Sequence, residues 1–142
     1  MKQLLILSLA LLLLTACDNR NSKKTDENAA TETTVQTVDP STVYVYYFHG
    51  KQRCKTCIAV GNVSEKAIKD LYASNPNVKF IEVQTDDEAN APLVEKYEVT
   101  WNALIIAKGD DYNEITKQAF ASAVNNPENL TDLIKIEVDK RL

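Results

Sequence analysis

The stretch VYVYYFHGKQRCKTC, residues 43–57, decides how the chain folds. Its first six residues are apolar or aromatic and predict a buried strand. Apolar residues at helical spacing follow, so Cys54 and Cys57 are expected at the start of a helix. A helix N-terminus offers free N–H groups and partial positive charge, which favour a thiolate. Cys54 is therefore the candidate nucleophile, and Cys57 is the candidate resolving thiol, which attacks a mixed disulfide on Cys54.

Basic residues lie on both sides of the first cysteine. Lys51, Arg53 and Lys55 bring positive charge to Cys54, and we expect this charge to favour the thiolate further. The two cysteines have three possible uses: dithiol exchange, binding of a soft metal or metalloid, and a passive structural disulfide. The disulfide would close too small a loop to restrict the unfolded chain much, so it is the least favoured.

His49 is the single histidine of the chain. It is a candidate third ligand beside Cys54 and Cys57, or a proton shuttle, and the alternative is an ordinary polar residue at a strand end. Together the three side chains would suit Cu(I), Zn(II) or As(III). A closed structural zinc site would need a fourth Cys or His, so structural zinc is not expected.

Trp101 and Asn102 fall in a loop that we expect to face the two cysteines. Trp101 is a candidate for stacking on an aromatic substrate, and the alternative is an aromatic that half-covers the core. The tyrosines within residues 44–47 are predicted to pack in the sheet. The acidic run at residues 86–88 is predicted to be a solvated helix start rather than a cation site.

Composition restricts the protein to a few classes. The chain has 142 residues, a net charge of −4 and 44% hydrophobic residues, which predicts at most one domain with a real core. The acidic balance gives no support for nucleic-acid binding. With no phosphate loop or dinucleotide fingerprint, no bound cofactor is expected beyond a redox-active Cys54–Cys57 disulfide. Electrons would then come from a partner protein.

The N-terminus predicts export. Residues 1–16 carry Lys2 and a Leu-rich run too short to span a bilayer. The run ends Leu-Thr-Ala before Cys17, which resembles the bacterial lipoprotein signal and implies lipidation of Cys17. The alternative is an ordinary signal peptide with a chance cysteine. Residues 17–42 are predicted to be a lipidated Cys and flexible linker on the periplasmic face of the inner or outer membrane.

The predicted fold is an α/β domain over residues 43–142, with the order β-α-β-α-β-β-α. The expected elements are strands at 43–48, 78–84, 102–107 and 112–117 and helices at 57–74, after Asn90 and after Asn126. Because helices separate the first three strands, we expect those strands to pair through right-handed crossovers, with a hairpin after them and a mixed sheet overall. The expected buried helix positions are Val60, Val63, Ala67, Leu71, Leu130, Leu133, Ile134 and Val138.

This order, with Cys-x-x-Cys opening the first helix, resembles the thioredoxin fold over about the last hundred residues. The resemblance implies a three-layer α/β/α architecture. The chain departs from the family in three places. Arg53 replaces the usual Trp, Lys55-Thr56 replaces Gly-Pro, and no proline stands at Asn102-Ala103, where the family has a cis-Pro. We expect a trans peptide there, and the missing proline leaves metal or arsenic binding more open.

The residues from Tyr46 to Cys57 are also similar to the thioredoxin-like nitrophenyl compound (nitroaromatic arsenical) nitroreductase subunit family, whose members share the His-Gly…Arg-Cys-x-x-Cys pattern. This resemblance implies a membrane-anchored thiol–disulfide oxidoreductase or electron-transfer subunit. Its partner would be a membrane thiol donor or a second reductase subunit. The alternative is a non-catalytic module that binds Cu(I) or As(III) through the same cysteines.

Overall fold

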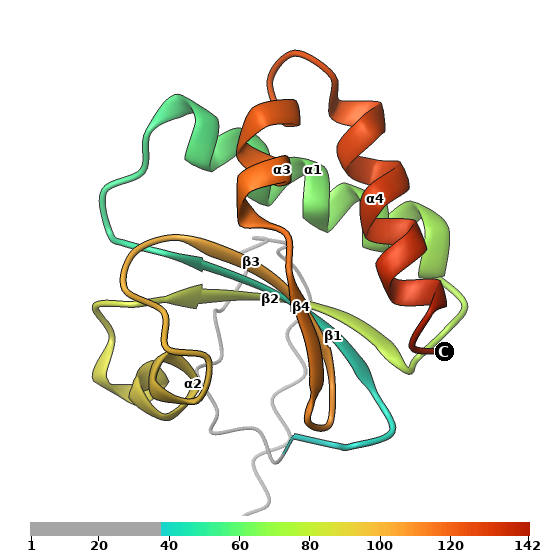
Figure 1. Cartoon of the computed structure of the whole chain (residues 1–142), viewed down its shortest axis with the longest axis horizontal. Helices are drawn as coiled ribbons and strands as arrows, with labels where there is room; N and C mark the ends of the chain where they lie inside the picture. Colours follow the sequence, from blue (N-terminus) through green and yellow to red (C-terminus); the bar gives the residue numbers. More distant parts are fainter. Residues whose placement is uncertain (1–37) are drawn as a thin grey trace, which may run out of the picture. The chain divides into compact units, whose positions relative to one another are not determined.

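The structure is a computed structural model that describes residues 38–142 (Figure 1). The predicted signal segment at 1–16, the lipidation of Cys17 and the linker up to residue 37 lie outside the described residues. Residues 39–42 form a turn, closed by the Thr42 N–H donating to the Asp39 carbonyl at 3.1 Å. In the described part of the chain, no helix combines the length and apolar character that crossing a membrane requires.

The first two strands are parallel and are joined by the longest helix. β1 (Val43–His49) pairs with β2 (Val78–Gln84), and α1 (Lys55–Tyr72) connects them. All seven residues of β1 are buried, because this strand lies inside the sheet with side chains covered on both faces. This register sets Tyr47 opposite Glu82.

β3 (Ala103–Lys108) runs antiparallel to β1, which corrects the expectation of three strands joined by crossovers. Between β2 and β3 the chain forms only a 3₁₀ turn, η1 (Glu88–Asn90), and α2 (Ala91–Lys96). A helix of that length rises about 9 Å, whereas a seven-residue strand spans about 23 Å. α2 therefore covers less than half the length of a strand, and β3 begins at the end of the sheet where β1 and β2 end, with Ala103 opposite Phe48.

β4 (Asp111–Glu114) completes a mixed sheet with the order β2-β1-β3-β4. It pairs antiparallel with β3 through the predicted hairpin, where Gly109 has a φ of 60°. β4 ends earlier than predicted, because α3 (Thr116–Ser122) begins where a strand was expected. The last helix, α4 (Pro127–Asp139), starts at the predicted proline. The described residues thus form an α/β domain with four α-helices.

Helices cover both faces of the sheet. α1, α3 and α4 lie on one side and α2 lies on the other (Figure 1). Alternate β1 residues belong to two separate clusters. Val45 and Tyr47 pack in the cluster that contains residues of α1, α3 and α4, whereas Tyr46 and Phe48 pack in the cluster that contains Tyr97. The α1 face differs from the prediction at Leu71, which is exposed. Its neighbour Tyr72 instead reaches α4 and donates to Asp139 at 2.6 Å.

Candidate functional site

The two cysteines occupy the start of α1, as predicted. Cys54 is the N-cap residue, with extended backbone, and its sulfur accepts a hydrogen bond from the Cys57 N–H at 3.2 Å. Cys54 is exposed, whereas Cys57 is 6% exposed, and both are free thiols. One sulfur therefore meets solvent while the other lies one turn inside the helix.

The local environment separates the acidities of the two thiols. Hydrogen bonds from the Cys57 thiol and then from the Cys57 N–H lower the pKa of Cys54, because they favour its charged form. Burial raises the pKa of Cys57, because it disfavours a thiolate. The accessible sulfur is thus the better nucleophile near neutral pH, and the buried one holds its proton.

The basic side chains contribute less than the sequence predicted. Arg53 turns toward β2, where its guanidinium pairs with Glu82 at 3.0 Å and lies 5.3 Å from the ring centre of Tyr47. Its positive charge is therefore balanced by a carboxylate. Lys51 and Lys55 are exposed to solvent, which screens their charges. Hydrogen bonds at the helix start favour the thiolate of Cys54 more than the basic side chains do.

His49 ends β1 as a buried side chain. Its Nδ1 lies 2.9 Å from the Gly50 carbonyl, and because a carbonyl only accepts, Nδ1 carries the proton. Its Nε2 lies 4.0 Å from a Glu82 oxygen. Among residues 38–142, no three His, Cys, Asp or Glu side chains are grouped to hold a metal. The structure therefore does not assemble the predicted ligand set of His49, Cys54 and Cys57.

Trp101 and Asn102 lie in the loop before β3. Because Ala103 pairs with Phe48 at the end of β1, this loop lies at the same edge of the sheet as the loop that carries Cys54. Trp101 is 79% exposed, so it does not half-cover the core. Asn102 is partly buried. The stacking role predicted for Trp101 stays a prediction.

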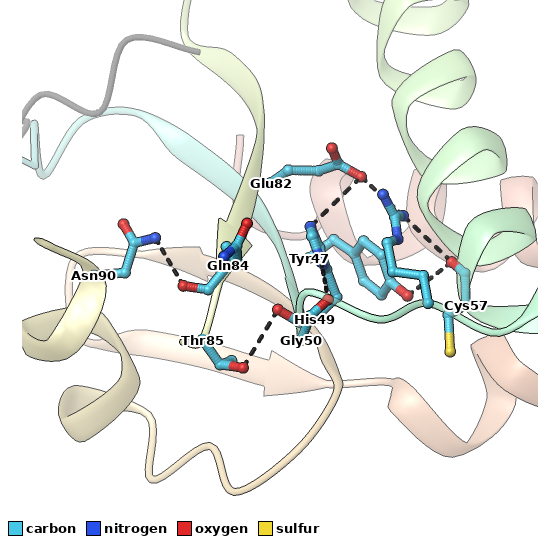
Figure 2. Close-up of polar contacts among 9 residues, drawn as sticks. Tyr47, His49, Gly50, Cys57, Glu82, Gln84, Thr85 and Asn90 are labelled. Carbon is cyan, nitrogen blue, oxygen red and sulfur yellow. Dashed lines mark hydrogen bonds and ion pairs between the residues drawn. The ribbon is translucent and has the colours of Figure 1, made fainter. Parts of the chain in front are cut away.

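Three residues that hold the cysteine loop were not predicted, and Figure 2 shows two of them, Tyr47 and Glu82. The Tyr47 hydroxyl donates to the Cys57 carbonyl at 2.7 Å, although the sequence suggested sheet packing alone. Burial raises the pKa of Tyr47 to about 12, so this hydroxyl stays a donor. Asp86 accepts a hydrogen bond from the Lys51 N–H at 2.8 Å, and Glu82 holds Arg53.

Comparisons with known proteins give little further information. No protein-family model matches the chain, and no curated protein matches it. A solved structure described as "Structure of a malarial protein" is similar at 23% identity, covering 68% of this chain and 97% of that one, with a TM-score of 0.47. A likeness this limited carries no inference about the site.

Proposed function

We propose that this chain carries out thiol–disulfide exchange through Cys54 and Cys57 on a thioredoxin-like domain. The fold supports the proposal because α1 joins two parallel strands, an antiparallel hairpin follows, and the cysteines open α1. In open α/β sheets, sites lie beyond the carboxyl ends of the strands, and Cys54 follows the carboxyl end of β1.

The exchange proceeds in two substitutions at sulfur. The Cys54 thiolate attacks one sulfur of a partner disulfide, whose S–S bond breaks as a mixed disulfide forms and one partner thiolate leaves. Cys57 then loses its proton to solvent and attacks the Cys54 sulfur. The second partner thiolate leaves, and the chain holds a Cys54–Cys57 disulfide. The partner has gained two electrons, and the same steps in reverse oxidise a partner dithiol.

One observation carries the proposal: an exposed sulfur with a lowered pKa lies one helical turn from a buried thiol with a raised pKa. Attack needs an accessible thiolate, and resolution needs a second sulfur within reach but protected from outside reagents. A passive structural disulfide requires neither property.

Anchoring through Cys17, export and a role in reducing nitroaromatic arsenicals extend the proposal. They depend on the resemblances of the sequence. A partner thiol donor or second reductase subunit would supply the electrons. The alternative function, binding of Cu(I) or As(III), would use the two thiolates, and His49 is not grouped with them among the described residues.

The test is to trap the mixed disulfide in the full chain with Cys17→Ser, which removes the third thiol. The added variant Cys57→Ser should accumulate a mixed disulfide on Cys54, whereas Cys54→Ser should accumulate none. Equilibration of the parent in glutathione buffers should give a reversible intramolecular disulfide with a defined potential. Thiols that form no disulfide but are protected by Cu(I) or As(III) would refute exchange and favour the binding module.

A further inference from the structure

We propose that Tyr47, Arg53 and Glu82 form a bracket that positions the resolving thiol of Cys57, and that Arg53 acts through this bracket rather than by activating Cys54. The inference rests on the proposed thiol–disulfide exchange, and it assigns three residues outside the dithiol to the second step of that exchange, resolution by Cys57. Tyr47 comes from β1, Arg53 from the loop and Glu82 from β2.

The bracket closes on one atom of the resolving cysteine. The Tyr47 hydroxyl reaches the Cys57 carbonyl oxygen at 2.7 Å, in a buried contact. Nη2 of Arg53 lies 3.5 Å from the same oxygen and 3.0 Å from the Glu82 carboxylate. The Cys57 N–H points to the Cys54 sulfur. The Cys57 N–H and the Cys57 carbonyl are thus both hydrogen-bonded. These contacts fix the Cys57 backbone and therefore the position from which its thiol side chain extends.

Gly61 leaves room for the three side chains of the bracket because it has no side chain of its own. Gly61 lies on the α1 face above the bracket, one turn after Cys57. A Cβ at Gly61 would lie 2.5 Å from Arg53 Nη2, 2.9 Å from Glu82 Oε1 and 3.1 Å from a Tyr47 ring carbon. Any larger residue would displace the ion pair. A glycine inside a helix weakens it, and here that glycine leaves room for the three side chains.

The second anchor of the loop is distinct. Asp86 accepts from the Lys51 N–H and so holds the loop where it leaves β1. It makes no contact with the Cys57 carbonyl among the hydrogen bonds of residues 38–142. The bracket is thus the part of the support that reaches the resolving cysteine itself.

A symmetric aromatic disulfide, dithionitrobenzoate, measures the two steps separately. In the reduced full chain with Cys17→Ser, attack by Cys54 releases one coloured thiolate and attack by Cys57 releases the second. Stopped-flow absorbance therefore gives a rate for each phase. Tyr47→Phe should leave the first phase unchanged within about twofold. It should slow the second about threefold to tenfold, since one buried hydrogen bond to the carbonyl is lost.

Arg53→Met and Glu82→Gln test how the charge acts. If Arg53 activated Cys54 electrostatically, these variants would change the first phase in opposite directions, because one removes a positive and the other a negative charge. Positioning predicts the same direction in both, a slower second phase with an unchanged first phase. Opposite effects on the first phase would overturn the inference.

Two control variants remove equivalent contacts elsewhere on α1. Tyr72→Phe removes the hydroxyl that contacts Asp139, and Glu65→Gln removes an exposed ion pair with Lys69. Both should retain the parental rates in both phases. Equal slowing of both phases in the bracket variants would indicate general distortion of the helix start and would overturn positioning, as would two unchanged phases. If the parent shows no second phase, the exchange function itself fails.

Discussion

Glu137→Gln should destabilise the domain at neutral pH, and the loss should shrink in acid. Glu137 lies in the last turn of α4, with its side chain 7% exposed. Its carboxylate contacts Lys140 Nζ at 2.6 Å and Arg141 Nη1 at 2.9 Å. Arg141 also pairs with Asp111, which ties the end of α4 to β4.

The size of the stability loss follows from the pKa of the Glu137 carboxyl group. The hydrogen bond from Lys140, and then that from Arg141, lower the pKa of Glu137 from 4.5 to about 2, against the opposing effect of burial. The folded pKa lies below the unfolded one. The stabilisation is therefore complete well above pH 4.5 and is lost as the pH falls toward 2. It amounts to roughly 3 kcal/mol at pH 7 and about 1 kcal/mol at pH 3.

Urea unfolding followed by circular dichroism at pH 7, 4 and 3 measures this difference between the parent and Glu137→Gln. Glu128→Gln is the control, because it makes the same change on an exposed side chain in the first turn of α4. The control should cost less than about 1 kcal/mol. A destabilisation by Glu137→Gln that is equally large at pH 7 and pH 3 would refute the assignment to the ionised carboxylate.

Three further results are expected. Glu98→Gly should stabilise the domain by about 0.5–1 kcal/mol in urea unfolding, because Glu98 follows the C-cap residue of α2 and has a φ of 51°, whereas Glu95→Gly within α2 should destabilise it. Leu104→Ala should cost about 3 kcal/mol, because Leu104 is fully buried in β3, and a loss as small as that of exposed Ile136→Ala would contradict its place in the core. Iodoacetamide at pH 7 should modify Cys54 before Cys57, as peptide mapping by mass spectrometry would show; preferential labelling of Cys57 would reverse the assigned acidities.

Much of the fold follows from local sequence patterns. The aromatic run of β1, the alternation of β2 and the Asn126-Pro127 start of α4 each act within a few residues, so their positions were predicted. The direction of β3 was not, because it depends on whether the connection after β2 can cross the sheet. The segment between Gln84 and Ala103 is long enough for either direction, so its length does not decide between them.

Some features of the candidate site could likewise be predicted from local sequence, and others could not. The places of Cys54 and Cys57 at the helix start follow from the helix that begins there. The support from Glu82 does not, because it requires the register that places Tyr47 beside Glu82 on neighbouring strands. Arg53 was assigned to the nearest cysteine in sequence, but its long side chain reaches a carboxylate on another strand.

The two sulfurs depend on different parts of the structure. Hydrogen bonds within one helical turn favour the thiolate of Cys54, so changes elsewhere in the sheet should alter its reactivity little. Cys57 instead depends on burial and on a carbonyl that accepts from Tyr47 of β1 and from Arg53 of the loop. Substitutions far from the dithiol should therefore act on resolution more than on attack. If the chain carries out the proposed exchange, slowed resolution would hold its partner longer in a mixed disulfide, and the bracket residues would set how long the two proteins stay joined.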